Sequence, residues 1–205
     1  MLNTLSGRFL VLTVVFVMLA EVLIFVPSVA RFRQDYLLLR LERAQIASLS
    51  LLADDMISED LEKELLKNAG VFNVVLRRDE VRQLILSSHV PGPVEATYDL
   101  RGASAWALMR DAMMTLFEPG EPVIRVIGMP VQGGGQEIEV TMEQGPLRAA
   151  MLDYGLNILM LSAVISVVVA GLLFLAVQAF LVKPIRGVVR YMKYYAEAPE
   201  DARRI

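Results

Sequence analysis

The chain has 205 residues, of which 55% are hydrophobic and only 21% charged, a balance too apolar for an ordinary soluble domain. The formal net charge is -3 and no dense basic stripe occurs, which argues against a nucleic acid as partner. Cysteine is absent, which excludes disulfides and thiolate metal sites, and the single histidine, His89, cannot build a metal cluster or a catalytic triad. We therefore predict no catalytic residues, no metal ligands and no cofactor in this chain.

The first apolar segment runs from Phe9 to Val26 and contains one formal charge, Glu21. Because about 20 apolar residues are needed to cross about 30 Å of hydrocarbon, residues 9–29 are predicted to form a transmembrane helix after a cytoplasmic segment, residues 1–8. The small-x-Ala sequence at 28–30 also fits the cleavage site of an export signal. The uncleaved anchor is favoured, because the apolar run exceeds the usual length of about 7–15 residues and arginines follow it directly.

Two helices are predicted next. The first runs from Ala30 to about Ala53, because this segment has no glycine or proline and is rich in leucine, arginine, alanine and glutamate. It continues directly from the transmembrane helix. The second begins after Ser58, which supplies an N-cap before several acidic residues, and ends at Gly70.

Residues 71–78 and 81–88 are β-branched and aliphatic runs separated by two acidic residues, which predicts a β-hairpin. Three arginines lie near its turn, and two interpretations of them stay open. They gather around an anionic ligand, or they form a solvated hairpin end. These residues are Arg77, Arg78 and Arg82.

Residues 102–117 are predicted to form a helix whose methionines, Met109, Met113 and Met114, fill the core. A second pair of strands is predicted at 122–131 and 136–144, joined by a glycine-rich loop that is expected to be a flexible tip.

The last predicted strand has alternating polarity, which indicates one buried and one solvent-exposed face. Its apolar residues are Ile138, Val140 and Met142, and its polar residues are Glu137, Glu139, Thr141 and Glu143. Together these elements predict a small antiparallel sheet flanked by helices, in an α+β extracytoplasmic domain covering residues 30–153.

The second apolar segment, Leu156 to Val182, has no charged residue. Residues 154–182 are predicted to form a second transmembrane helix, continuing a helix that begins near Pro146. Four basic residues crowd its far end, whereas only Arg148 lies shortly before it. The positive-inside rule therefore places both termini in the cytoplasm and residues 30–153 in the periplasm, with the chain in the bacterial inner membrane. The four basic residues are Lys183, Arg186, Arg190 and Lys193.

Polar residues inside the spans suggest contact between membrane helices. Glu21 lies about 15 Å below the outer boundary of its span, where an unpaired carboxylate is costly. At a similar depth in the second span, Ser162, Ser166 and Ala170 form a ladder of small residues that lets helices approach closely. One hypothesis is that Glu21 and this face pack the spans together, within a subunit or across a dimer. The alternative is that the small residues are ordinary filler.

The last segment, residues 183–205, begins with a lysine and Pro184, which is tolerated in the first turn of a helix. Apolar residues then recur at the spacing of a parallel coiled-coil seam. The seam consists of Ile185, Val188, Met192 and Tyr195. An apolar span, a Lys-Pro junction, this seam and the sequence "AEAPEDARRI" together resemble the start of a HAMP linker, and in particular the connector of alphaproteobacterial sensor histidine kinases.

The resemblance implies that the chain is the input half of a homodimeric receptor, with residues 183–205 as a partial HAMP linker whose seam transmits the signal. On fold analogy, the outer domain is similar to PAS-like (PDC-type) periplasmic sensors. A parent kinase would add a second HAMP helix, a histidine-bearing helix and a domain that binds ATP and Mg²⁺, and would pass its phosphoryl group to a cognate response regulator. The stimulus stays open: a small anion, a pH change or a protein partner.

Two alternatives to the kinase stay open. A chemoreceptor or a cyclase would share every one of these features in its input half. A small two-span membrane protein that scaffolds other subunits belongs to a different class, and it predicts an ordered C-terminus. Membrane lipid is a partner in all of these cases.

Overall fold

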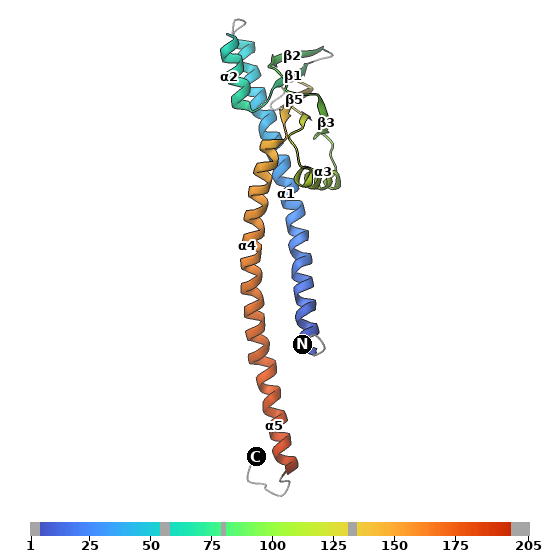
Figure 1. The fold of residues 1–205 in the computed structure, drawn as a ribbon, viewed down its shortest axis with the longest axis vertical. Helices are drawn as coiled ribbons and strands as arrows, with labels where there is room; N and C mark the ends of the chain where they lie inside the picture. The colour runs from blue at the N-terminus through green and yellow to red at the C-terminus, as the bar shows by residue number, and fades with distance from the viewer. Residues whose placement is uncertain (1–4, 54–57, 79–80, 131–134, 198–205) are drawn as a thin grey trace. The chain divides into compact units, whose positions relative to one another are not determined.

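The computed structural model describes residues 5–53, 58–78, 81–130 and 135–197 of the chain. Within these ranges it leaves out the side chains of residues 5–11, 50–53, 78, 81–85, 181, 186 and 195–197. The chain divides into two compact units, residues 1–158 and 159–205. The first unit holds a five-stranded sheet with helices packed on it, and the described part of the second unit, residues 159–197, is helical (Figure 1).

A single helix, α1 (Leu5–Ala53), contains both the first apolar segment and the first predicted helix of the domain, with Pro27 inside it. The prediction of one continuous helix is therefore confirmed. Beyond Pro27, one face of α1 is buried against the domain, since the buried residues recur at helical spacing. They are Val29, Arg33, Leu37, Leu41, Ala44 and Ala47.

Helix α2 (Glu59–Ala69) begins and ends where the sequence predicts. The hydroxyl of Ser58 accepts a hydrogen bond from the Leu61 amide at 3.4 Å, which caps the first turn. Gly70 ends the helix with φ +67°, a left-handed conformation that favours glycine. Helix α2 packs against α1 and contributes the buried Leu66 to the core.

The strands are β1 (Asn73–Arg78), β2 (Val81–Ser87), β3 (Val94–Asp99), β4 (Val123–Gly128) and β5 (Glu137–Glu143). Their order in the sheet is β2-β1-β5-β4-β3. The two predicted strand pairs, β1 with β2 and β4 with β5, are confirmed as antiparallel, and β5 also pairs antiparallel with β1.

The prediction of a wholly antiparallel sheet is wrong, because β3 lies parallel to β4 at the edge of the sheet. Strand β3 was not predicted from the sequence. Parallel neighbours need a long crossover between them, and α3 (Ala105–Phe117) provides it here. The domain is therefore a small mixed sheet with helices.

Helix α3 begins after Ser104, whose hydroxyl accepts a hydrogen bond from the Ala107 amide at 3.2 Å. Two of its methionines, Met109 and Met113, pack against the core as predicted. The prediction is wrong for Met114, which is 56% exposed because it lies about 100° around the helix from Met113, away from the core.

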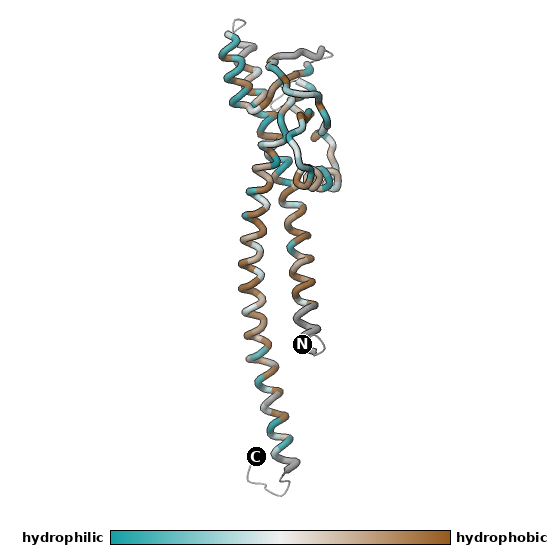
Figure 2. The backbone as a smooth tube through the Cα atoms, viewed as in Figure 1, coloured by the Kyte–Doolittle hydropathy of each residue, from teal (hydrophilic) through white to brown (hydrophobic). Residues whose placement is uncertain are grey.

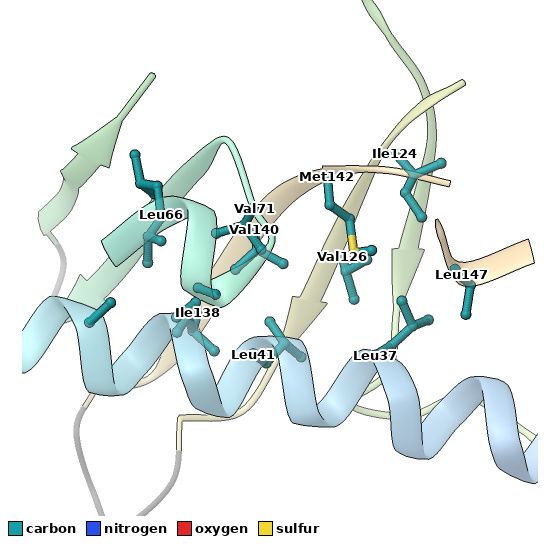
Figure 3. Packing of buried hydrophobic residues seen from close by; sticks show 14 of the residues in the cluster. Leu37, Leu41, Leu66, Val71, Ile124, Val126, Ile138, Val140, Met142 and Leu147 are labelled. Carbon is teal, nitrogen blue, oxygen red and sulfur yellow. The ribbon is translucent and has the colours of Figure 1, made fainter. Parts of the chain in front are cut away.

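One face of the sheet packs on α1 and forms the core, as Figure 3 shows for Leu37 and Leu41 beneath the sheet. The predicted inward residues of β5 are all buried: Ile138, Val140 and Met142. The predicted outward face of β5 is less exposed than expected. Thr141 is buried at 7% exposure, lying between Arg125 of β4 and Asn73 of β1 in the register of the sheet.

Helix α4 (Gly145–Val177) starts one residue after β5, and a π-helical turn, η2 (Gln178–Val182), joins it to α5 (Lys183–Glu197). Pro184 explains this turn, because a proline lacks its amide hydrogen and clashes with the carbonyl of residue i−4 in an α-helix. In the wider turn, the Lys183 amide donates instead to the Gln178 carbonyl.

Within the described ranges, two helical stretches are long and apolar enough to cross a membrane. They are Leu12–Leu49 in α1 and Gly145–Tyr194 in the α4 to α5 run. Figure 2 shows hydrophobic residues dominating the part of α1 that lies before the sheet domain and most of α4. In the first stretch, the segment before Pro27 carries exposed apolar side chains such as Phe16 and Leu23.

Candidate functional site

A cavity of about 340 Å³ lies where α1, α2, the segment Gly70–Phe72 and the start of α4 meet. Arg40 from α1 and two lysines from α2, Lys63 and Lys67, line it. Glu143, at the end of β5, is the single carboxylate among the described residues of the lining. The described wall of the cavity therefore carries a surplus of two positive charges.

Arg40 is held in place by neutral acceptors. Its Nη1 donates to the Ala69 carbonyl at 2.9 Å, and its Nη2 donates to the Tyr36 hydroxyl at 2.7 Å. Its guanidinium also lies 4.9 Å from the centre of the Tyr36 ring. No ion pair of Arg40 occurs among the described residues, so its charge is positioned but not neutralised.

Gly70 makes this position of Arg40 possible. A Cβ atom at residue 70 would overlap Arg40 Nη1, and the left-handed φ of +67° disfavours any other residue in addition. From the sequence, Gly70 is predicted only as a helix end, and Arg40, Lys63 and Lys67 are not predicted as a group. The only signal was the four-residue spacing of the two lysines, which places them on one face of a helix.

Arg33 is a second notable cation, buried at 1% exposure between three elements. Its Nε donates to the Thr115 hydroxyl of α3 at 3.1 Å, and its guanidinium lies 4.2 Å from the centre of the Tyr98 ring of β3. Its Nη2 is buried without a hydrogen-bond partner among the described residues. Desolvation by burial lowers the pKa of Arg33, and the nearby Tyr98 and Asp111 act in the opposite direction.

Aromatic rings join α1 to α4 below the sheet. The rings of Phe32 and Tyr154 are stacked, with centroids 4.3 Å apart, and the Tyr36 ring lies 6.4 Å from that of Phe32. Close by, a Cβ atom on Gly155 of α4 would lie 3.3 Å from the Phe25 ring of α1. The two helices therefore contact one another through these side chains where α4 leaves the sheet domain.

The three arginines predicted near the first hairpin are only partly described. Arg77 is exposed at the end of β1, where it pairs in register with Arg82 of β2 and Glu137 of β5. Arg78 pairs in register with Val81. The side chains of Arg78 and Arg82, and loop residues 131–134, lie outside the described residues, so an anion site at this hairpin stays a prediction.

The outer face of the sheet carries ion pairs. Arg101 donates to both oxygens of Asp99 and to Glu137 Oε2, and Arg125 lies 3.8 Å from Glu139. The side-chain and backbone hydrogen bonds from Arg101 lower the pKa of Asp99 to about 2. Glu137 and Glu139, which were predicted to be solvent-exposed on β5, are therefore paired with arginines.

The predicted seam lies on one helix, α5, together with Pro184. Ile185, Val188 and Met192 are 58–67% exposed, and the side chain of Tyr195 lies outside the described residues. The role of the seam stays a prediction.

The residues predicted to pack inside the membrane belong to different units. Glu21 is half-buried in the first unit, and Ser162, Ser166 and Ala170 lie in the second. Their packing against one another stays a prediction. Among the described residues no cluster of potential metal ligands occurs.

Comparison with known proteins gives no relative: no family model, no curated protein and no solved structure matches the chain. A functional interpretation therefore rests on the residues and on their arrangement.

Proposed function

We propose that the chain is the sensing and membrane-spanning input part of a homodimeric bacterial receptor, similar in layout to the input half of a sensor histidine kinase. The observation that carries this proposal is that both apolar helices are also core helices of the sheet domain. In α1, Leu37 and Leu41 are buried in the core. In α4, Leu147 and Met151 are fully buried. A change in the packing of the domain therefore has to move helices that also carry the apolar segments.

The connection between the sheet and α4 supports the same proposal. Only Gln144 separates β5 from α4, and its side chain is buried at 1% exposure. Its backbone N–H donates a hydrogen bond to the Pro122 carbonyl at 3.0 Å. Arg148 in the first turn of α4 donates to the Leu116 carbonyl of α3 at 3.3 Å. Because no flexible linker intervenes, a displacement of the sheet passes directly into the helix.

The seam of α5 supports a dimer. Three apolar side chains at coiled-coil spacing, Ile185, Val188 and Met192, are more than half exposed in the single chain. Burial against the same helix of a second chain would remove this apolar surface from water. In this proposal α5 is the first helix of a HAMP linker, and Pro184 marks its start.

The location follows from the charge pattern at the ends of the spans. In this proposal the chain lies in the bacterial inner membrane, both termini are cytoplasmic, and the sheet domain is a periplasmic sensor of the PAS-like (PDC-type) class. The mixed sheet with one long helix on one face is compatible with that class on fold analogy alone. An output module that binds ATP and Mg²⁺ and phosphorylates a response regulator belongs to the kinase version of the proposal.

Cysteine crosslinking tests the dimer and the seam, because the chain has no cysteine of its own. Single cysteines at Ile185, Val188 and Met192 should form disulfide-linked dimers in oxidised membranes. A cysteine at Arg190, on the opposite side of the heptad, is the matched control and should crosslink poorly. Equal crosslinking at all four positions, or none, would contradict the proposal.

A second measurement tests signal transmission. One alanine inserted after Lys183 turns α5 by about 100° relative to α4 and should change the output in cells that carry the complete coding frame. An unchanged output would argue for the two-span scaffold instead. The coding frame after Ile205 distinguishes the kinase, in which a histidine-bearing helix and an ATP-binding domain follow, from a chemoreceptor or a cyclase.

A further inference from the structure

We infer that the cavity between α1, α2 and the start of α4 binds a small organic dianion, namely a phosphate monoester or a dicarboxylate with a short apolar body. The part of this inference that makes the ligand a stimulus rests on the proposed receptor function. The binding itself does not.

Arg40 supplies the first part of the site. A guanidinium carries five N–H donors in a rigid fork that matches a carboxylate or a phosphate. Two of these donors are used, by the Ala69 carbonyl and the Tyr36 hydroxyl, and both acceptors are neutral. The remaining donors have no acceptor among the described residues, and the position of the fork is fixed by contacts that leave its charge available.

The two lysines define the charge of the ligand. Lys63 and Lys67 lie one turn apart on α2, and both line the cavity. Lys63 has an exposed partner, Glu59, at 3.9 Å, a pair of little strength, whereas Lys67 has no ion pair within the described part of the chain. Glu143 is the single opposing carboxylate in the described lining, so the surplus of two positive charges favours a dianion over a neutral molecule or a monoanion.

The other residues of the lining limit the size of the ligand and favour an apolar group on it. The half-buried Phe72 brings apolar surface to the same cavity, and the buried Leu66 and Met142 complete its apolar lining. A volume of about 340 Å³ is at the lower end of the range for ligand pockets, about 300–1,000 Å³. The cavity therefore fits a small molecule with a charged end and a compact apolar end.

The cavity is connected to the membrane side of the domain by a row of side chains on α1. Arg40, Tyr36 and Phe32 follow one another at four-residue spacing and are in contact, and Phe32 stacks on Tyr154 of α4. Pro146 in the first turn of α4 lines the cavity itself. A ligand that draws Arg40 toward α2 would therefore act on both core helices.

Calorimetric titration of the full chain in lipid nanodiscs tests the binding. The probes are phenyl phosphate and phthalate, both dianions with an aromatic ring, and benzamide is the neutral control. We expect saturable binding of at least one dianion and none of benzamide. The dianion that binds more tightly shows whether a phosphate monoester or a dicarboxylate is the natural class.

Charge-removing variants locate the site. Arg40→Gln and Lys67→Gln should each weaken binding at least tenfold, because each removes a charge-assisted hydrogen bond. Arg43→Gln is the matched control, since Arg43 is exposed on the same helix outside the cavity, and it should leave affinity unchanged. Arg40 also supports the end of α2, so Lys67→Gln decides the matter if Arg40→Gln unfolds the domain.

Three results would overturn the inference: no saturable binding of either dianion, equal binding of benzamide, or an equal loss of affinity in Arg43→Gln. The receptor proposal fails separately. If the α5 cysteines do not crosslink while the dianion still binds, only the receptor proposal falls. If they crosslink as expected and no dianion binds, only the inference about the ligand falls.

Discussion

Phe32 of α1 stacks on Tyr154 of α4, with ring centroids 4.3 Å apart and planes 14° from parallel. This contact lies where α4 leaves the sheet domain. The next residue of α4, Gly155, lies close to the Phe25 ring of α1. The two helices that carry the apolar segments are therefore joined by direct packing as well as through the sheet. In the proposed receptor, this junction is where a change in the domain would become a relative movement of two membrane helices.

The stacked pair should contribute a measurable coupling energy. We expect a double-mutant cycle of Phe32→Ala and Tyr154→Ala to give a coupling of about 0.5–1.5 kcal/mol beyond the loss of buried area. Denaturant unfolding of the four proteins in the same micelle measures it. Additive effects of the two substitutions would mean that the rings touch without stabilising the junction.

Gly155 should be much less tolerant of a side chain than Gly171 on the same helix. A Cβ atom at Gly155 lies 3.3 Å from the Phe25 ring, whereas at Gly171 it would meet no described atom within 4 Å. Overpacking of this kind costs about 1–3 kcal/mol, so Gly155→Val should lower the thermal unfolding midpoint by several degrees. Gly171→Val is the control, because the change in helix propensity is the same. Equal shifts in the two variants would show that the Phe25 contact can relax freely.

Local signals in the sequence predicted most of the elements. Ser58 and Gly70 mark the two ends of α2 through hydrogen bonds within their own turns, and both ends appear where expected. Helix α3 begins after Ser104, three residues later than the predicted start at residue 102. Both antiparallel pairs were also predicted, because each consists of neighbouring strands joined by a short connection. In these cases the sequence near the element determines its structure.

The mixed sheet and the cavity could not be predicted in the same way. Strands β3 and β4 pair although the whole of α3 lies between them in the sequence. This pairing is determined by tertiary packing and not by residues near a turn. Arg40 and Lys67 meet only because α2 folds back on α1, and neither residue carries a motif. The arginines of the first hairpin were therefore identified from the sequence, whereas Arg40 and the two lysines of the cavity were not.

Replacing Arg33 by methionine should leave the free energy of unfolding of the domain unchanged or raise it by up to about 4 kcal/mol. Methionine retains the apolar stem while removing a buried charge and the unpaired Nη2. Thr115 loses one partner but still donates to the Asp111 carbonyl at 2.9 Å. Arg33→Ala, which also leaves a cavity, should be destabilising by about 2–5 kcal/mol. If the methionine variant unfolds as readily as the alanine variant in denaturant, the polar contacts of Arg33 are what stabilise the domain.

Asp99 should titrate below its usual range for as long as Arg101 is present. The hydrogen bonds from Arg101 hold its pKa at about 2, against an ordinary value of 3.8. The stabilisation from this lowered pKa is fully present above about pH 4 and is lost as the pH falls through about 2. In Arg101→Gln the pKa should rise toward the ordinary value, which a ¹³C NMR titration of the Asp99 carboxyl measures. An unchanged titration curve would mean that Arg101 does not bind Asp99 in solution.

Trp106 should lie at the membrane interface. It is the chain's one tryptophan and is 76% exposed on α3, as is Phe117 at the other end of that helix. Figure 1 shows α3 at the end of the sheet domain from which α1 continues into its apolar segment, and Thr115 ties α3 to Arg33 of α1. Exposed aromatic residues at this level are typical of the boundary between lipid and water.

Quenching of Trp106 fluorescence by lipids brominated near the headgroup tests this position in reconstituted membranes. The matched control is Trp106→Phe combined with Leu61→Trp, because Leu61 is exposed on α2, near the far end of α1 and about 30 Å from the level of Arg33 by helix rise. We expect strong quenching of Trp106 and weak quenching of the tryptophan at position 61. Equal quenching at both positions would mean that the sheet domain lies flat on the bilayer. No quenching at either position would place α3 in water and would contradict the prediction.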